Sequence, residues 1–247
     1  MDWRAIGVGL RVGGHRGAAG RAPENTFAGF ELAWRAGADY LELDVQLTAD
    51  GRPVAFHDEM LERTTDGHGP LAGTSWTDLQ RLDAGAWFEP RFAGQRIPAL
   101  AAVLAWLEAR PPLGATIEAK GPASGAVIAA AVIRSRARDR LSICSFAAGE
   151  LLAAAAAAPE VPRLLIVDRD DAPGDPLALA RAAGATGVNL PWPWCSRDLV
   201  ARLHEAGLLV AGGTVDDIEG LRACLALGLD VVDSNVPDVV VAALVGG

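Results

Sequence analysis

The sequence of 247 residues contains few cysteines and no CxxC motif. Cys144, Cys195 and Cys224 are far apart and odd in number, which argues against a disulfide framework and against a thiolate zinc site. No hydrophobic run reaches the roughly 18 to 20 residues that a membrane-spanning helix needs, and the N-terminus has no signal-peptide pattern. These absences lead us to expect a protein of the reducing cytoplasm, without stable insertion into a membrane.

Positive charge is also scarce. The sequence has 22 Lys and Arg against 31 Asp and Glu, a formal net charge of -9, so we do not expect a non-specific nucleic-acid binder, which needs a basic surface. A small anionic substrate is still compatible, because a local cluster of cations can oppose the net charge. Lysine is the rarest charged residue, since Lys120 is the only one in the sequence.

Hydrophobic residues, in contrast, make up 51% of the sequence, which is enough for a large core. Short β-type runs alternate with longer helical segments, a pattern typical of parallel strands joined by crossover helices. About 250 residues is also a usual length for a TIM barrel. We therefore predict an α/β fold, a (β/α)8 TIM barrel that forms a single domain over residues 1–247. An open doubly wound sheet is the alternative, but no GxGxxG motif opens the first helix.

The predicted elements follow from hydrophobic runs, helical periodicity and glycine at helix ends. The predicted strands cover 6–14, 39–45, 52–57, 114–119, 140–144, 162–167, 187–190, 208–213 and 230–233. The predicted helices cover 24–37, 98–110, 123–138, 147–158, 175–184, 196–206, 216–227 and 236–245. Counting the second and third strands as one hairpin-like unit leaves the eight βα units that close a barrel.

Residues 58–97 interrupt this alternation. They contain turn signals and aromatic residues, among them Trp76, Trp87 and Phe88. We predict a small insertion after the second strand, an inserted subdomain that buries its aromatic side chains over one end of the barrel.

Polar residues stand at the ends of four predicted strands. The C-terminal ends of parallel barrel strands meet at one face of the molecule, and the active sites of such barrels lie there. Residues two apart on a strand point the same way. Glu42 therefore shares a face with Asp44, and Glu118 shares a face with Lys120. Polar pairs are costly to bury inside a barrel unless they bind something. The strand-end residues are His15, Arg16, Glu42, Asp44, His57, Glu118 and Lys120.

Three of these side chains, Glu42, Asp44 and Glu118, are carboxylates that would repel one another at the mouth of a barrel. A divalent cation relieves such repulsion, and a set of oxygen ligands favours Mg²⁺ or Ca²⁺ over zinc. The sequence therefore predicts a divalent-metal site. The plain alternative for Glu118 is a structural ion pair with Lys120.

Two histidines and two cations surround this predicted metal site. His15 and His57 could serve as nitrogen ligands, but imidazole titrates near neutral pH, and we therefore interpret them as the acid and the base. Arg16 and Lys120 would supply fixed positive charge for an anion. A metal, two cations and an acid–base pair around one point indicate phosphoryl transfer.

Taken together, these motifs resemble the glycerophosphodiester phosphodiesterase family, most densely from 13 to 120. The family's fold is a TIM barrel with a small insertion after the second strand, where 58–97 lies. The motifs that carry the resemblance are Gly14-His15-Arg16-Gly17, Pro23-Glu24-Asn25-Thr26, Glu42-Leu43-Asp44-Val45, Asp50-Gly51 leading to His57-Asp58, Thr65-Asp66-Gly67, Ile97-Pro98-Ala99-Leu100 and Ile117-Glu118-Ala119-Lys120, with a weaker match at Ser145-Phe146.

The resemblance implies roles for the matching residues. His15 and His57 would be the acid–base pair, and Arg16 and Lys120 would contact phosphate. The implied metal ligands are Glu42, Asp44 and Glu118, and the implied supporting residues are Glu24 and Asn25. Glu24 would lie near the metal or orient His15 and Arg16.

The implied reaction is hydrolysis of a glycerophosphodiester to sn-glycerol 3-phosphate and an alcohol. Either a neighbouring glycerol hydroxyl or water would attack first. Two alternatives are phospholipase D-like cleavage of lysophospholipids, which needs an apolar rim, and a non-catalytic phosphodiester-binding protein.

The C-terminal third departs from the family pattern. Gly213-Thr214-Val215-Asp216 stands where the family often has Trp-Thr-Val-Asn, and Ser234-Asn235-Val236-Pro237 stands where it often has Thr-Asp before a proline. We hypothesise that Trp192 or Trp194 partly refills the space of the missing indole and reshapes the pocket; the alternative is a surface or core tryptophan. We expect His204, in a helical segment, to be solvated.

Overall fold

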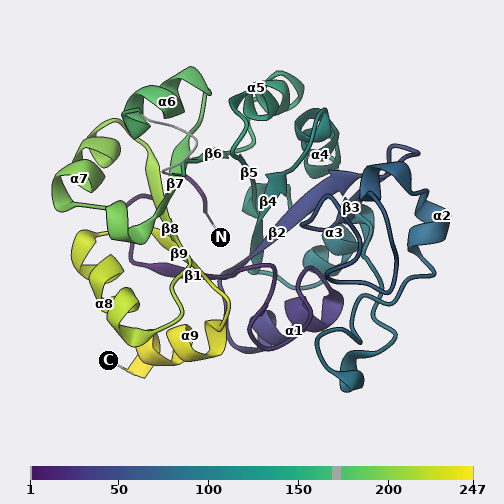
Figure 1. The fold of residues 1–247 in the computed structure, drawn as a ribbon. Coiled ribbons are helices and arrows are strands. Elements are labelled where there is room, and N and C mark those ends of the chain that lie inside the picture. The colour runs from purple at the N-terminus through teal and green to yellow at the C-terminus, as the bar shows by residue number, and fades with distance from the viewer. Residues whose placement is uncertain (1, 169–173, 247) are drawn as a thin grey trace.

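The structure, a computed structural model, describes residues 2–168 and 174–246, and its strands form a closed barrel ringed by helices (Figure 1). The sheet order is β1-β9-β8-β7-β6-β5-β4-β2-β3, and an additional parallel pairing of β1 with β2 closes the ring. The strands are β1 Arg11–Gly14, β2 Tyr40–Leu47, β3 Pro53–Ala55, β4 Gly114–Ala119, β5 Leu141–Ser145, β6 Arg163–Ile166, β7 Gly187–Pro191, β8 Leu209–Gly213 and β9 Val231–Ser234.

Eight of these strands are parallel to their neighbours, whereas β3 pairs antiparallel with β2 and lies outside the ring. The predicted (β/α)8 barrel is therefore confirmed. The helices are α1 Phe27–Arg35, α2 Trp76–Leu79, α3 Leu100–Glu108, α4 Ser124–Val132, α5 Ala148–Ala157, α6 Pro176–Ala182, α7 Arg197–Glu205, α8 Ile218–Leu227 and α9 Pro237–Gly246. Among the described residues, no helix combines the length and the apolar character needed to cross a membrane.

Two predicted elements extend furthest beyond the observed ones. The strand predicted at 6–14 begins only at Arg11, because Gly7 and Gly9 have φ values of 68° and 113°, which interrupt an extended backbone. The helix predicted over 123–138 ends at Val132, and a separate 3₁₀ turn follows at Arg138–Arg140. Before Arg11, the hydrophobic pattern therefore continues beyond the regular backbone.

Helix α1 also begins later than the predicted residue 24. Thr26 is its N-cap, and the Thr26 hydroxyl accepts a hydrogen bond from the backbone N–H of Gly29. Asn25, just before the cap, has a φ of 54°. Residues 24 and 25 therefore lie in the loop between β1 and α1, where their side chains can turn toward the barrel.

The interior of the barrel is apolar at the N-terminal ends of its strands. The Trp3 indole N–H donates to the carbonyl of Arg140, which directly precedes β5, and the Trp3 ring packs edge-on against Tyr40 with centroids 4.8 Å apart. Gly13 is required beside them, since a Cβ atom at this position would lie 2.3 Å from the Tyr40 ring. The buried interior residues are Trp3, Tyr40, Cys144, Leu164, Leu209, Ala211 and Val231.

Leu43 and Ala119, which alternate with the polar strand residues, are buried in the main core between the strands and the helices. This is the orientation that strand periodicity predicts. Residues 58–97 pack on a separate hydrophobic cluster, which includes Leu61, Leu71 and Leu79 and against which Trp76 packs. The expectation of buried aromatic residues is wrong for Trp87, which lies outside this cluster and has an exposed fraction of 38%.

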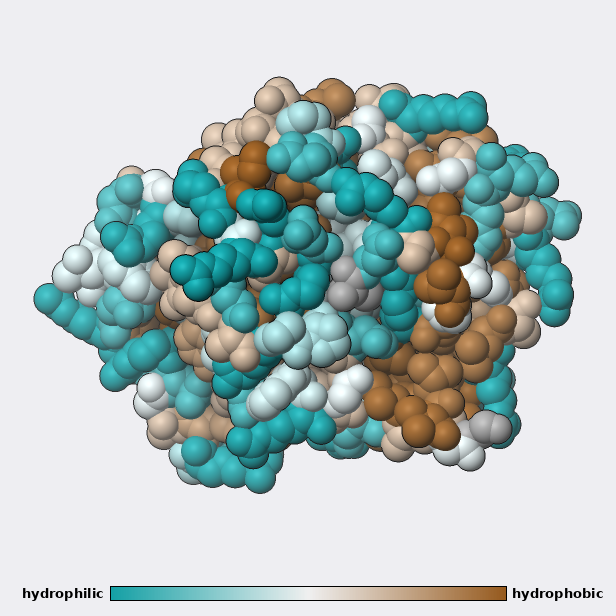
Figure 2. Space-filling model, turned by 180° about the vertical axis from the view of Figure 1, so that it is seen from behind, coloured by the Kyte–Doolittle hydropathy of each residue, from teal (hydrophilic) through white to brown (hydrophobic). Residues whose placement is uncertain are grey.

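Hydrophobic residues also gather on part of the outer surface. Seen from behind, they lie at the lower right, where the view places α8 and α9 (Figure 2). Exposed members of these helices include Ile218, Leu225 and Val245. None of the three lines the cavity described below, so this surface is separate from the predicted site.

Candidate active site

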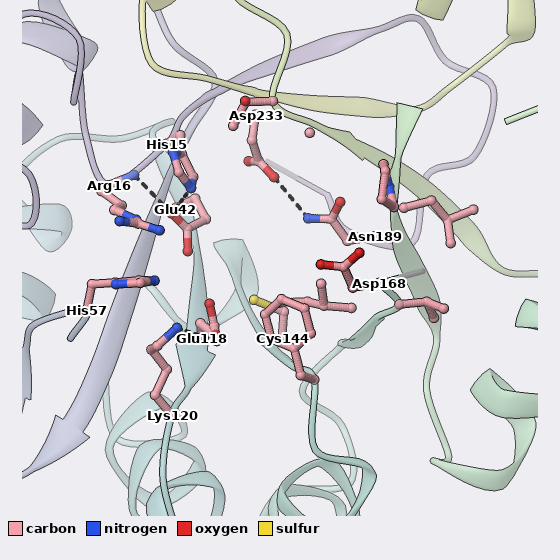
Figure 3. Close-up of a pocket in the computed structure, with 17 residues that line it drawn as sticks. His15, Arg16, Glu42, His57, Glu118, Lys120, Cys144, Asp168, Asn189 and Asp233 are labelled. Atoms are coloured by element: carbon pink, nitrogen blue, oxygen red, sulfur yellow. Dashed lines mark hydrogen bonds and ion pairs between the residues drawn. The ribbon is translucent and has the colours of Figure 1, made fainter. Parts of the chain in front are cut away.

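A cavity of about 220 Å³ opens at the C-terminal ends of the strands (Figure 3). Six of the predicted site residues line it together: His15, Arg16, Glu42, His57, Glu118 and Lys120. Glu42 lies on β2 and Glu118 on β4, and the other four lie in the loops that follow β1, β3 and β4. Asp233 and Asn189 face them from β9 and β7. Both histidines thus line the same cavity.

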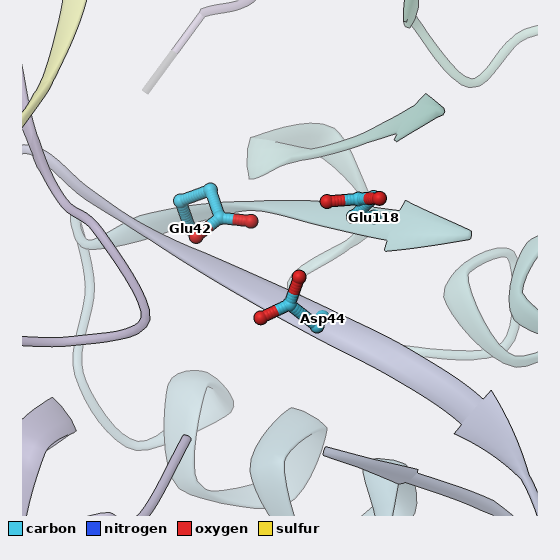
Figure 4. Close-up of side chains that lie close together, drawn as sticks. All are labelled: Glu42, Asp44 and Glu118. Atoms are coloured by element: carbon cyan, nitrogen blue, oxygen red, sulfur yellow. The ribbon is translucent and has the colours of Figure 1, made fainter. Parts of the chain in front are cut away.

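Below the mouth of the cavity, the side chains of Glu42, Asp44 and Glu118 converge (Figure 4). Glu42 and Asp44 lie on β2, and the register of the barrel pairs Asp44 with Glu118 on β4. All three residues are buried, and one carboxylate oxygen from each lies within 4.8 Å of the others. We call these three residues the carboxylate cluster.

Two cations partly neutralise the carboxylate cluster. The Lys120 ammonium lies 3.1 Å from Glu118 Oε1 and 3.4 Å from Asp44 Oδ1. Arg16 Nε lies 3.3 Å from Asp44 Oδ2, and the backbone N–H of Arg16 donates to Glu42 Oε2 at 2.9 Å. Burial opposes the ionisation of Asp44, but Arg16 and Lys120 outweigh it and lower the pKa of Asp44.

The other two carboxyl groups are less well compensated. Burial, and then the charge of Asp44, raise the pKa of Glu42 well above its ordinary value. Burial and Asp44 likewise raise the pKa of Glu118 to about 7, although Lys120 opposes the shift. When all three carboxylates of the cluster are ionised, two nearby cations leave an excess of negative charge. The cluster therefore carries a net negative charge that a further cation would neutralise.

The negative charge of the cluster and its oxygen donors suit a hard divalent cation. The donors are carboxylate oxygens from adjacent strands, which suit Mg²⁺ or Ca²⁺. Asn25 strengthens the arrangement, because its Nδ2 donates to Asp44 Oδ2 at 2.7 Å and its Oδ1 accepts from the Asp44 backbone N–H at 3.1 Å. Glu42, Asp44 and Glu118 are thus the residues that could hold a metal ion.

Glu24 lies outside the carboxylate cluster. It accepts a hydrogen bond from Arg16 Nη1 at 3.0 Å and two from the Arg63 guanidinium at 2.8 Å each. Burial works against its ionisation, but the bonds from Arg63 and the charge of Arg16 lower the pKa of Glu24. Of the two positions that the resemblance implies for Glu24, near the metal or beside His15 and Arg16, this contact with Arg16 fits the second.

His57 is held by a carboxylate. Its Nδ1 lies 2.6 Å from Asp58 Oδ1, and its backbone carbonyl accepts from Gln46 Nε2 at 2.8 Å. Asp58 in turn pairs with Arg63, whose hydrogen bond is the main reason that the pKa of Asp58 falls to about 2. Since an ionised carboxylate only accepts, His57 Nδ1 carries a proton and His57 Nε2 is the nitrogen left for the cavity.

His15 has a neutral partner instead. Its Nδ1 lies 2.7 Å from Asn235 Oδ1, and its Nε2 lies 3.9 Å from Glu42 Oε2. Asn235 is bonded to Asp216 through both its side chain and its backbone N–H. Both residues belong to the motifs that depart from the family pattern, but no spacing rule places a residue 220 positions away beside His15.

A further buried carboxyl group, Asp233, lines the opposite wall of the cavity. It accepts from the Tyr40 hydroxyl at 2.8 Å and from Asn189 Nδ2 at 3.0 Å, and burial raises its pKa. The sequence reading missed Asp233, because the hydrophobic run around it predicts only a buried strand. It also missed Arg63, which lies in the inserted segment.

Two other expectations are not met. Neither Trp192 nor Trp194 is among the described residues that line the cavity, and Trp192 packs against the outer core, next to Gly212 and Gly220. The rim near the missing indole is formed by Gly213, Thr214 and Pro191 instead. His204, expected to be solvated, is partly buried, and its Nε2 lies 2.9 Å from Asp230 Oδ2.

Comparisons with known proteins agree with this architecture. Residues 15–239 match the model of the glycerophosphoryl diester phosphodiesterase family. The chain is 34% identical to YhdW of Bacillus subtilis (strain 168) over 92% of its own length and 95% of that protein. It is 31% identical to a glycerophosphodiester phosphodiesterase of Bacillus altitudinis, again over 92% and 95% of the two chains.

Solved structures show the same similarity. A glycerophosphodiester phosphodiesterase from Agrobacterium tumefaciens str. C58 superposes with a TM-score of 0.82 at 31% identity, covering 95% of this chain and 100% of that one. A phosphodiesterase from Oleispira antarctica, solved with its product sn-glycerol-3-phosphate, superposes with a TM-score of 0.86 at 29% identity, covering 96% and 97%.

Proposed function

The chain belongs to the glycerophosphoryl diester phosphodiesterase family, and from that membership we propose that it hydrolyses glycerophosphodiesters to sn-glycerol 3-phosphate and an alcohol. The observation that carries this proposal is the placement of two histidines and two cations around a buried carboxylate cluster, within one cavity. The product bound to the Oleispira antarctica relative supports the identity of the phosphate-bearing product. The small cavity suits a small-molecule substrate rather than a polymer.

In this proposal, Glu42, Asp44 and Glu118 hold one Mg²⁺ or Ca²⁺ ion. When bound, the ion supplies Lewis-acid polarisation of the phosphoryl group and offsets its negative charge. Arg16 and Lys120 are within reach of the same cavity, and they bind the phosphate oxygens as fixed cations. Burial keeps these charges in a poorly screened environment, where they act more strongly than in water.

His15 and His57 carry out the proton transfers. One imidazole removes a proton from the attacking hydroxyl, which belongs either to the glycerol moiety or to water, and the other gives a proton to the oxygen of the departing alcohol. Both rings present Nε2 as the nitrogen not engaged by Asn235 or Asp58. Glu24 and Asn25 support the site by orienting Arg16 and Asp44. The three free cysteines agree with our expectation of a reducing, cytoplasmic location.

The test is release of glycerol phosphate from a panel of glycerophosphodiesters, with a lysophospholipid assayed beside them. We expect turnover that EDTA abolishes and that Mg²⁺ or Ca²⁺ restores. His15→Ala and His57→Ala should each remove most of it while circular dichroism stays unchanged. Full activity in chelator would refute the metal assignment. Binding of the diesters without turnover under either metal would instead support a non-catalytic binding protein.

A further inference from the structure

The side-chain amide of Asn235 lies between His15 and Asp216. From its geometry we propose that Asn235, held by Asp216, is a positioning residue that fixes His15 in the tautomer protonated on Nδ1. The proposal rests on the proposed function only in giving His15 a proton-transfer role. The tautomer itself follows from the hydrogen bonds.

Asp216 sets the orientation of the amide. Its Oδ2 lies 2.7 Å from Asn235 Nδ2, while its Oδ1 accepts from the Asn235 backbone N–H at 2.7 Å and from the Ser234 hydroxyl at 3.1 Å. A carboxylate offers only acceptors. The reversed amide would therefore bring two oxygens to 2.7 Å from each other. Asp216 thus directs the amide nitrogen toward itself and Asn235 Oδ1 toward His15.

This orientation decides which nitrogen of His15 carries the proton. Asn235 Oδ1 lies 2.7 Å from His15 Nδ1 and can only accept, so Nδ1 must be the donor. A neutral imidazole has one N–H. Nε2 then bears the lone pair, on the side of the ring that faces Glu42 and the cavity. The other tautomer would present an N–H to the cavity and could not take up a proton there.

The three residues come from three neighbouring segments of the barrel. His15 directly follows β1, Asn235 follows β9 and Asp216 follows β8, and these strands are adjacent in the sheet. The backbone N–H of His15 also donates to the carbonyl of Ser234 at 2.8 Å. The barrel register therefore places the chain of Asp216, Asn235 and His15 independently of any bound ligand.

The tautomer can be measured directly in the intact wild-type protein. We expect long-range ¹H–¹⁵N correlation spectra, recorded where the ring is neutral and assigned with a His15→Gln variant, to show His15 protonated on Nδ1. His57 is the internal control, because its Nδ1 faces Asp58 rather than Asn235. In Asn235→Ala, the signals of His15 should shift toward a mixture of both tautomers, whereas those of His57 should not change.

The same variant separates positioning from substrate binding. Asn235→Ala should lower kcat by about 10²-fold, the usual contribution of a well-placed acid or base, with little change in KM. A residue that only held the loops in place would leave the His15 tautomer unchanged.

Exchanging the two residues gives a sharper test that preserves their shapes. Asn235→Asp alone places two carboxylates against each other, and Asp216→Asn alone no longer fixes the direction of the Asn235 amide. The double variant, Asp216→Asn with Asn235→Asp, again pairs one carboxylate with one amide. The carboxylate, now at position 235, accepts the hydrogen bond from His15 Nδ1. We expect both single variants to lose turnover and the double variant to recover most of it, a strong positive coupling.

Three results would overturn the proposal: a wild-type His15 protonated on Nε2, an unchanged tautomer in Asn235→Ala, or a double variant no more active than the single ones. If Asn235→Ala does not fold, the wild-type spectrum and the exchange variants still decide. Because the spectra need no substrate, failure of the proposed phosphodiester hydrolysis and failure of this inference remain distinguishable.

Discussion

Lowering the pH from 7 to 6 is expected to weaken divalent-metal binding, because protons compete for the carboxylate cluster. The pKa of Glu118 is raised to about 7, chiefly by burial and then by the charge of Asp44. A carboxyl group with a raised pKa keeps its proton until the pH approaches that value, and a metal ion must displace the proton. Metal affinity should therefore rise with pH and change most below pH 7.

The size of the effect follows from the titration of Glu118. The fraction of ionised Glu118 falls about fivefold between pH 7 and pH 6, so the association constant should fall by about the same factor, or about 1 kcal/mol. Glu42, whose pKa is also raised, adds to the loss. Asp44 does not, since the pKa of Asp44 is lowered and its carboxylate is already ionised in this range.

Isothermal titration calorimetry with Mg²⁺ or Ca²⁺ measures both the affinity and the number of protons released, provided each pH is run in two buffers of different ionisation enthalpy. About one proton should leave Glu118 at pH 6 for each ion bound. Glu205→Gln, an exposed position at the end of α7, is the matched control and should change neither quantity. Equal affinity at the two pH values, with no net proton release, would refute the reasoning.

Three further predictions concern stability and positioning. Gly13→Ala should destabilise the protein by about 3 kcal/mol in urea unfolding, because the new methyl group would overlap the Tyr40 ring. Gly149→Ala is the control, since its methyl group would meet open space in α5. Equal urea midpoints for the two variants would contradict the packing argument. Thr26→Ala removes the N-cap of α1 and should cost about 1 kcal/mol in the same assay, so an unchanged midpoint would mean that the cap is dispensable. Asp58→Asn should lower kcat by about tenfold or more without altering the circular dichroism spectrum, because the adjacent histidine loses its charged partner; wild-type kcat would show that this charge is not needed.

The alternation of hydrophobic runs was enough to predict the barrel, because each strand and each helix must bury a face against the same core. The exact ends of elements were harder to predict. Gly7 and Gly9 delay the start of the first strand through their backbone angles, while the residues around them look like a strand. Similarly, Asn25 takes a left-handed conformation within what reads as the start of a helix.

The inner part of the candidate site was predictable for a different reason. Parallel strand ends must meet, so Glu42, Asp44 and Glu118 could be brought together from sequence position alone. The residues that hold the surrounding side chains in place could not be predicted in this way. Asn235 reaches His15, and Arg63 reaches Asp58 and Glu24, from loops whose paths depend on tertiary packing, and a single sequence contains no signal for such contacts.

Trp3 and Tyr40, packed edge to face, fill the barrel on the side away from the mouth of the cavity. Cys144 belongs both to this apolar cluster and to the lining of the cavity, so described side chains close the cavity from below. Under the proposed function, a diester whose phosphate lies toward Lys120 would have its alcohol portion near the rim, and the departing alcohol would leave outward before the phosphorylated product.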